Sequence, residues 1–548
     1  LGPSQGPQYI LWVARKRNDA LGLYKTPQSF GAHQIGPEET ALIPGSLQDP
    51  LRSLQHLPGL QRAPMNAGWL LVRGTGPEDT PVHWKALPLP QLFHLGGIAS
   101  ILHPESLESI RYQPNPWVNR TGSLGGQVEL SPADAASKTR VRAGSDLINA
   151  TGHIALPISQ NKSVFAAARA SWMRRVLALV QGEESARIAP QFADWSAGLT
   201  GSQSAFMLLG FADGIDTPTA DGEQILQVDL SGHQAMGYWE GSHGNHRWMF
   251  SALVAWDSEK LSDDGEALSL QADQHARLHV EDKIQVNQAR LELGFDGSLG
   301  RGRVAVFPQD FSRQWARSEG YVSLDIPAPV HVSMGLRNTH IWIQGQSSRL
   351  ELSPALRLQL PVHDSMKLRV QTSRHHQAPP THLLIGDPEG AYANLARADS
   401  ISGAMTWQTP STELQLEAFS KDLSKLPMRE KDGTLGQFTG DCWGVEAFAK
   451  TQSSHFSASL SAAFARSYRQ EDPSKERQPD ALDPGIQFAA IGIWRGPKDW
   501  FVSSRVRYAS GVPFQEDRPS AIDLLTQQEI LLRPTINPAT GRLPDPYA

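Results

Sequence analysis

The stretch Leu350-Glu351-Leu352-Ser353-Pro354-Ala355-Leu356-Arg357-Leu358-Gln359-Leu360 alternates apolar and polar residues with a period of two. In an extended chain its leucines share one face, whereas Glu351, Ser353, Arg357 and Gln359 share the other. This pattern is typical of a strand with one apolar and one wet face. It resumes at 366–373 and has an upstream counterpart at 277–293. The second half of the chain is therefore predicted to be built from long amphipathic strands.

Short and long connections alternate along the chain between these strands. Short connections are expected at 361–365, 409–411, 451–454 and 496–499, and long ones at 375–394, 421–441 and 469–485. An up-and-down barrel in an outer membrane has this asymmetry, with tight turns on one side and long loops on the other. The alternation favours such a barrel over a soluble β-sandwich.

The length of the strand region sets the size of the barrel. From Thr139 to Ala548 the chain has room for about 16–20 strands of the usual transmembrane length. Side chains cannot fill a closed barrel of that width, so its interior must be wet or plugged. The alternatives are a pair of soluble β-sandwiches or a propeller, although no repeat of propeller period is visible.

Composition excludes several classes of protein. The net charge is -6 with Lys+Arg 50 and Asp+Glu 56, which gives no reason to expect nucleic acid as a partner. No apolar run approaches the roughly 20 residues that a membrane helix needs. The single cysteine, Cys442, can form neither a disulfide framework nor a cysteine metal site. A membrane barrel stays possible, because each of its strands gives only a weak signal.

Residues 36–136 have a different texture, with frequent Gly and Pro between short apolar stretches. Segments 69–73, 82–84, 109–112 and 126–130 are expected to be strands. This part of the chain is predicted to be a small α+β domain.

A series of motifs runs through this region in a fixed order. They are Leu57-Pro58-Gly59-Leu60, Leu71-Val72-Arg73-Gly74, Leu92-Phe93-His94-Leu95-Gly96-Gly97, Leu107-Glu108-Ser109-Ile110-Arg111-Tyr112 and Gly122-Ser123-Leu124-Gly125-Gly126-Gln127-Val128-Glu129-Leu130. Their order and spacing resemble the plug domain of TonB-dependent outer-membrane receptors. The chain departs from the family pattern at Lys85-Ala86, at Asn115 and at Thr121.

Later segments resemble barrel motifs of the same family. They are the stretches 436–446, 505–514 and 536–547. The resemblance implies a mainly β fold, a large antiparallel transmembrane β-barrel of the 22-stranded type with an N-terminal α+β plug. It divides the chain into an N-terminal periplasmic segment (1–34), the plug (35–136) and the barrel (137–548). Because members of the family continue to further strands, we expect the chain to be truncated at its C-terminus.

The resemblance also implies roles for particular residues. The plug motif comprises Arg73, Gly74, Gly96, Gly97, Gly122, Gly125 and Gly126, where the glycines allow positive φ or a close approach to the barrel wall. Arg73, beside a turn, can hold carbonyls or a carboxylate. Plug apices at 62–66, 75–80 and 91–96 are expected to face an imported ligand, through Asn66, Glu78, Asp79 and His94.

Trp12, Val13 and Ala14 lie ahead of the plug, in the apolar stretch 10–14. The family carries there a short extended segment that pairs as an added strand with TonB, the energising partner in the periplasm. This position makes the stretch the candidate partner-binding strand, although a stray apolar patch in a tail has the same appearance.

The function implied is active import of a scarce ligand, such as a ferric siderophore, cobalamin or an oligosaccharide, across the outer membrane. The alternative is a surface binding or adhesion β-protein without transport. No catalytic constellation is visible, so no enzyme and no cofactor are predicted. The pairs His243/His246 and His375/His376 lack accompanying carboxylates and are expected to be loop histidines, not metal ligands. The polar face of the strands, with Arg357, Lys367 and Arg369, is expected to point toward the plug, and the leucines toward lipid.

Overall fold

The computed structural model describes residues 8–15 and 32–513 with short gaps. The gaps are 62–67, 90, 121, 183–185, 187–188, 219–224, 264–265, 307, 328, 347, 386–393, 430–434, 471–473, 475, 481, 498–499 and 512. Asn66 and the motif at 536–547 lie outside the described residues. Within the described part, no helix is long and apolar enough to cross a membrane.

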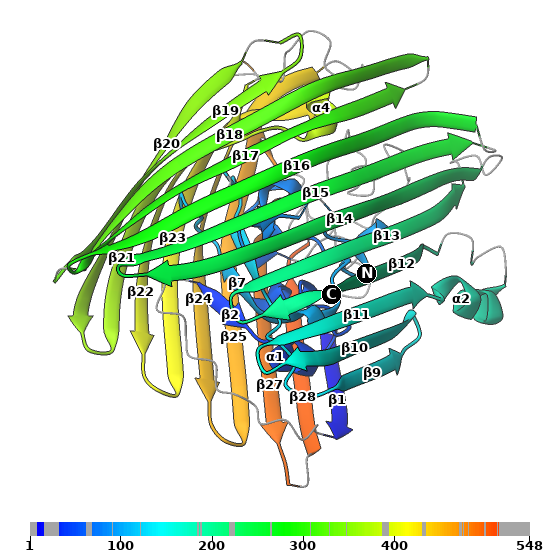
Figure 1. Ribbon diagram of the computed structural model, residues 1–548. Coiled ribbons are helices and arrows are strands. Elements are labelled where there is room, and N and C mark those ends of the chain that lie inside the picture. The colour runs from blue at the N-terminus through cyan, green and yellow to red at the C-terminus, as the bar shows by residue number, and fades with distance from the viewer. Residues whose placement is uncertain are drawn as a thin grey trace.

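One large antiparallel sheet of 21 strands forms the outer wall of the molecule (Figure 1). Consecutive strands pair as hairpins from β9 to β28, except that the two-residue β26 and the long β27 both pair with β25. In the described part of the chain twenty strands follow residue 139, within the number expected from chain length. Their bounds are β9 (Arg140–Ser145), β10 (Asn149–Ser159), β11 (Lys162–Ser171), β12 (Gln191–Gly201), β13 (Ser204–Pro218), β14 (Ile225–His243), β15 (His246–Asp263), β16 (Glu266–Val286), β17 (Ala289–Val306), β18 (Gln309–Pro327), β19 (His331–Ile343), β20 (Arg349–His363), β21 (Met366–Gln377), β22 (Ala396–Gln408), β23 (Thr412–Arg429), β24 (Leu435–Gln452), β25 (Phe456–Gln470), β26 (Gln478–Pro479), β27 (Gly485–Arg495) and β28 (Trp500–Ala509).

The two ends of this wall have different connections. At one end the hairpins close over two to four residues, for example 160–161, 244–245 and 409–411. We call this the short-turn end and the other the long-loop end. At the long-loop end lie 172–190, with α2 (Met173–Gln181), and 378–395, with α4 (Thr381–Ile385). Of the three long connections predicted from the sequence, those at 375–394 and 469–485 are found, as 378–395 and as 471–484 around β26. The same end also has two connections of only two residues, 264–265 and 307–308.

One loop prediction was wrong. The polar stretch 421–441 belongs mostly to β23 and β24, which leaves only 430–434 between the strands. Backbone pairing continues across this stretch, with a register shift between Leu423 and Leu426. Strands that project beyond an apolar layer need no apolar outer face, so their sequence reads as a loop.

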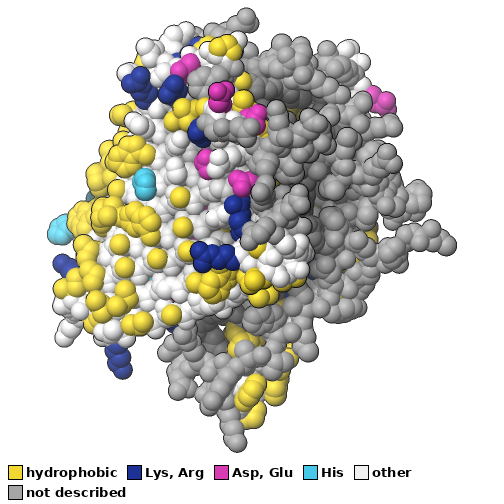
Figure 2. All heavy atoms as spheres, turned by 90° about the vertical axis from the view of Figure 1, so that its right-hand side faces the viewer, with side chains coloured by type: hydrophobic (Ala, Val, Ile, Leu, Met, Phe, Trp, Pro, Cys, Tyr) yellow, Lys and Arg dark blue, Asp and Glu magenta, His cyan; other side chains and the backbone are white. Residues whose placement is uncertain are grey.

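The faces of the strands are sorted as predicted. Leu350 and Val370 are 62% and 49% exposed on the outside, whereas Arg357 and Arg369 are 5% and 7% exposed on the inside. Lys367 alternates onto the inner face but is exposed. Figure 2 shows hydrophobic side chains gathered on the outer surface at the left of the view. The wall is therefore apolar outside and polar inside, the arrangement of a membrane barrel and the reverse of a soluble one.

Exposed tryptophans mark two levels on the outer face. Nearer the short-turn end lie Trp239, Trp407, Trp494 and Trp500, and nearer the long-loop end lie Trp195, Trp256, Trp342 and Trp443. Aromatic girdles at two levels bound the apolar band of barrels that sit in a membrane.

Inside the wall lies a small α+β region, drawn in blue and cyan in Figure 1. We call it the plug. Its main sheet has the order β2-β7-β8-β5-β6, and β3 pairs with β4 in a second sheet. The elements are β2 (His33–Ile35), α1 (Pro37–Leu42), η1 (Arg52–His56), β3 (Leu60–Gln61), β4 (Leu71–Val72), η3 (Pro77–Asp79), β5 (Val82–Trp84), β6 (Leu87–Pro88), η4 (Leu95–Gly97), η5 (Pro104–Ser106), β7 (Leu107–Gln113) and β8 (Gln127–Pro132). The four strands predicted in this region correspond to β4, β5, β7 and β8.

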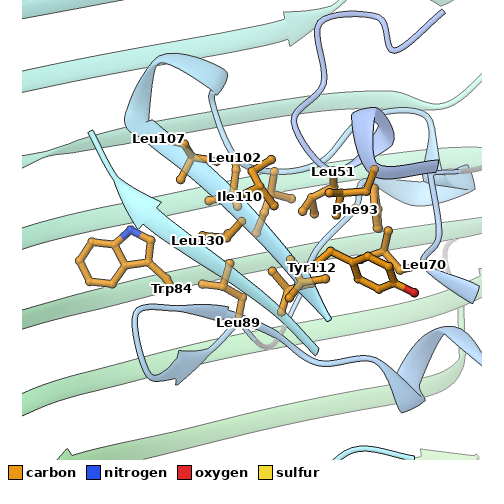
Figure 3. Packing of buried hydrophobic residues seen from close by; sticks show 14 of the residues in the cluster. Leu51, Leu70, Trp84, Leu89, Phe93, Leu102, Leu107, Ile110, Tyr112 and Leu130 are labelled. Atoms are coloured by element: carbon orange, nitrogen blue, oxygen red, sulfur yellow. The ribbon is translucent and has the colours of Figure 1, made fainter. Parts of the chain in front are cut away.

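The plug has its own apolar core. Side chains from β4, β5, β7 and β8 meet those of the connecting loops, as Figure 3 shows for Leu51, Trp84, Ile110, Tyr112 and Leu130. The same cluster continues into barrel residues of β13–β15. The plug is thus packed against the wall, and its position is fixed by apolar contact as well as by the polar contacts described below.

The segment β1 (Gln8–Arg15) contains the candidate partner-binding residues. It is extended, as expected, but it pairs antiparallel with β28 of the same chain: Trp12 with Ser503, Val13 with Val502 and Ala14 with Phe501. In this structure the segment is therefore part of the wall and not a free tether. Its pairing with a second protein stays a prediction.

Candidate functional site

Arg73 forms the centre of a buried ion cluster between plug and barrel. It follows β4 at a positive φ of 51°, and this turn aims its side chain at the wall. Its Nε and Nη2 donate to Glu446 at 2.9 and 2.7 Å, and Nη2 also donates to Glu417 at 3.0 Å. The guanidinium lies 4.1 Å from the ring centroid of Phe419. Of the partners expected for Arg73, carbonyls or a carboxylate, the structure shows carboxylates, two in place of one.

Two further residues complete this cluster. Asn115 accepts from Arg73 Nη1 at 2.7 Å and donates to Glu417 at 2.5 Å. Arg369, from β21, donates to the other oxygen of Glu417 at 2.9 Å. Two guanidinium groups thus face two carboxylates. Burial opposes the charge on Arg73, but Glu446 and Glu417 outweigh it and raise the pKa of Arg73. The cluster is neutral overall and joins the plug to β21, β23 and β24.

A second cluster joins the plug to the wall formed by β16–β19. Arg120 donates to Glu281 at 2.9 Å and to Glu129 of the plug at 3.0 Å. Asn119 donates to Glu292 at 3.1 Å. Arg337 of β19 donates to the carbonyl of Val118 at 2.8 Å. Consecutive plug residues 118–120 are therefore each tied to the wall.

A third contact involves His94. Its Nδ1 lies 2.6 Å from Asp213 and its Nε2 lies 2.9 Å from Asp194, while its ring stacks on Phe192 at 4.3 Å. Burial lowers the pKa of His94, but the bonds to the two carboxylates outweigh it, so the pKa is raised. With both ring nitrogens engaged, His94 holds the plug to β12 and β13. Its role as a ligand contact stays a prediction.

Glu78 and Asp79, the other predicted ligand residues, lie in η3 near the long-loop end. Gln377, the last residue of β21, donates to the carbonyl of Glu78 at 3.1 Å and to Asp79 at 3.3 Å. The Glu78 side chain reaches solvent, but it lies within the lumen, where the surrounding protein removes much of the water around it. This desolvation, together with the charge of the neighbouring Asp79, raises the pKa of Glu78 to about 7. Both residues thus lie beside the end of β21, near the connection 378–395, and their contact with a ligand stays a prediction.

Gly122 and Gly74 stand where the plug passes close to the wall, whereas Gly125 and Gly126 approach other residues of the plug. A Cβ on Gly122 would lie 1.8 Å from the carbonyl oxygen of His376. A Cβ on Gly74, which has a φ of 74°, would lie 2.6 Å from Ser467. These two motif glycines are therefore required by the fit between plug and barrel, as the sequence predicted.

The described parts of the connection 378–395 pack against the inner face of the wall at the long-loop end. Leu384 and Leu395 join Ile341 and Ile343 of β19 in a buried cluster. Ile385, at the end of α4, lies over Gly302 of β17, where a Cβ would come within 1.8 Å of it. This connection, which begins at the end of β21, thus reaches across to the wall at β17 and β19.

The histidines also differ from expectation. His375 and His376 are buried residues of β21 and not loop residues. His243 and His246 flank a short turn, as expected. Within the described ranges no group of three or more His, Cys, Asp or Glu side chains is arranged to hold a metal ion.

The chain resembles several solved structures of transport proteins. No family model and no curated protein matches the chain. The unliganded ferric citrate transporter FecA matches with TM-score 0.69 and 12% identity over 88% of this chain and 84% of that one. The FrpB iron transporter of Neisseria meningitidis (F5-1 variant) matches with TM-score 0.68 and 11% identity, covering 86% of each chain. The copper transporter OprC matches with TM-score 0.67 and 10% identity, covering 89% of this chain and 88% of that chain. The fold is that of the TonB-dependent receptors.

Proposed function

We propose that this chain, whose fold is that of the TonB-dependent receptors, is an energised importer of a scarce small ligand across the outer membrane. Ferric siderophores, cobalamin and oligosaccharides are the candidate ligands. The short-turn end then faces the periplasm and the long-loop end the outside. The proposal rests on the likeness of the fold together with one observation. A folded plug is held inside the barrel by buried ion pairs at two separate parts of the wall, at β24 and at β16.

This observation supports gated transport for an energetic reason. Buried ion pairs that are fully partnered cost several kcal/mol to separate, because each charge would be left without a partner. Thermal motion therefore rarely opens such a plug, and a passive pore would gain nothing from it. An external partner that pulls on the N-terminal part of the chain supplies the required work, so the proposal includes a TonB-type protein in the periplasm.

Uptake and surface binding by the complete protein in whole cells separate transport from binding. A strain lacking the protein should fail to grow on one scarce source among single iron, copper, cobalamin or glycan sources, and the gene should restore growth. Restored binding of that source at the surface without uptake would instead support the alternative, a binding or adhesion protein that does not transport.

Val13→Pro tests whether β1 is the partner-binding strand. Proline removes a backbone donor and fixes φ, so it weakens strand pairing with any partner. If β1 binds the energising protein, uptake is lost while ligand binding and heat-modifiable migration of the barrel persist. If β1 belongs only to the wall, where Val13 pairs with Val502, the barrel loses thermal stability. Uptake then falls only in proportion to the amount of folded protein that is lost.

A further inference from the structure

The outer face of the wall carries a groove near the short-turn end. Its volume is about 610 Å³, within the range of roughly 300–1,000 Å³ that small-ligand pockets span. It lies over β12–β15 and reaches Ile158 of β10 and Lys162 of β11. It faces away from the plug, since Leu199, Phe206, Trp239 and Phe250 on its sides are 43–50% exposed. It belongs neither to the plug nor to the lumen.

The register of the strands explains the groove. Phe206 pairs with Gly237, which pairs in turn with Ala252, and these three share the outer face. In the next row Leu208 pairs with Ala235, which pairs with Val254. Side chains on neighbouring strands of one face stand about 5 Å apart. Small residues at 235, 237 and 252 therefore form a recessed floor between larger apolar side chains.

The chemistry of the rim differs from that of the floor. Lys162 is exposed and is the charged residue among those lining the groove, at its short-turn edge. It pairs across the sheet with Gly201, and Ser204 and Trp239 lie beside it in the same outer row. An apolar channel that ends at a cation, a hydroxyl and an exposed indole complements a molecule with a long apolar chain and an anionic head.

We propose that this groove is a binding site for one phospholipid, with an acyl chain over Gly237, Ala235 and Ala252 and the phosphate at Lys162. The inference goes beyond import and requires only that the barrel lies in a membrane. Two observations favour a lipid over a protein occupant. The groove is at the level of the tryptophan girdle nearer the short-turn end, and its charge stands at the edge where headgroups lie.

The test is native mass spectrometry of the intact protein extracted in detergent, with phosphatidylglycerol added as probe. The wild-type protein should retain one phospholipid. Ala252→Phe fills the floor and should lower retention about tenfold. Ala418→Phe makes the same change on the outer face of β23, away from the groove, and should leave retention unchanged. Lys162→Gln should weaken retention about two- to fivefold, the usual contribution of one exposed ion pair. Heat-modifiable migration shows that each variant is folded.

Three results would overturn the proposal. Equal retention in Ala252→Phe and Ala418→Phe would mean that lipid binds the whole apolar band without a specific site. Loss in Ala252→Phe with no effect of Lys162→Gln would point to an uncharged apolar occupant. A species of twice the mass that carries no lipid and disappears in Ala252→Phe would make the groove an interface with a second copy. If Ala252→Phe does not fold, Ala235→Phe fills the same floor from β14 and carries the same expectations.

Discussion

Arg73 joins the plug to both β23 and β24. Its guanidinium is 2% exposed and carries bonds to three side chains from three parts of the chain. Burying such a charge costs several kcal/mol, and the carboxylates compensate only while the geometry holds. The cluster therefore contributes less to total stability than to the definition of one plug position.

Replacing Arg73 with Met should destabilise the plug by about 3–5 kcal/mol, because buried Glu446 loses the guanidinium that it binds and buried Glu417 keeps one of its two guanidinium partners, Arg369. Proteolysis of the plug in the folded barrel should become faster in proportion. Lys85→Met, which removes a half-exposed pair with Glu240, serves as the control and should cost at most about 1 kcal/mol. Equal protease resistance in the two variants would contradict a special role for Arg73.

His94 gives the plug contact a pH dependence of known sign. The pKa of His94 is raised in the folded protein, so its contribution to stability is fully present below the unfolded pKa of about 6.5 and is lost as pH rises through the folded pKa. His94→Gln keeps hydrogen bonding but does not titrate. The melting temperature of the wild type should exceed that of His94→Gln by more at about pH 6 than at about pH 9. A constant difference would show that His94 is held neutral.

The sequence predicted that Arg73 holds carbonyls or a carboxylate, but not which of the two and not which residue. Glu446 was part of a motif and Glu417 was not, and both lie more than 300 positions from Arg73 along the chain. Contacts of that separation depend on how the barrel curls around the plug, which local pattern does not encode. Lys85 and Asn115, which depart from the family pattern, both bind barrel carboxylates. These departures are thus part of the plug's attachment.

At the scale of elements, alternation predicted the strands well wherever one face meets an apolar layer. The prediction failed at 421–441, where Leu423, Leu426 and Phe438 of β23 and β24 are buried among polar neighbours and the register shifts between Leu423 and Leu426. The shift interrupts the period of two, so the strand signal is lost. The packing of Leu384 and Ile385 could not be predicted for a different reason. Both are buried against residues of strands that are distant in the sequence, and local pattern does not encode such contacts.

Gly302 of β17 has no side chain, and this allows α4 to pack closely against the wall. A Cβ there would lie 1.8 Å from the end of the Ile385 side chain, so Gly302→Val should displace the connection 378–395 while leaving the β17 pairing intact. A spin label at Ala378 should become more mobile in this variant, and external ligand should reach the lumen faster. Gly403→Val, on the open outer face of β22, is the matched control and should change neither. Unchanged label mobility in Gly302→Val would mean that α4 is not held by this contact.

At the scale of the whole molecule, the barrel and the plug place opposite demands on the chain. The wall needs an apolar outer face and a wide lumen, whereas the plug must fill that lumen and still be able to yield. The plug packs against β13–β15 through apolar contacts, and it is bound by ion clusters at two other parts of the wall. Its attachment is therefore distributed around the barrel. No single contact then holds the plug, and a pull applied at one end can release the contacts in sequence.

Removing the plug tests whether it is what closes the barrel. Barrels of about 16–18 strands already leave an aqueous channel, so this wall without residues 33–132 should form large open pores in planar lipid bilayers. The complete protein should conduct little, because the same residues occupy the lumen and their charges are paired with the wall. Arg73→Met combined with Asn119→Ala should give intermediate, flickering conductance, since the plug then keeps its apolar contacts but loses ties on two walls. Heat-modifiable migration must show that the plugless barrel is folded. A folded plugless barrel that conducts no more than the complete protein would show that the loops, with α4 at their centre, and not the plug, seal the channel.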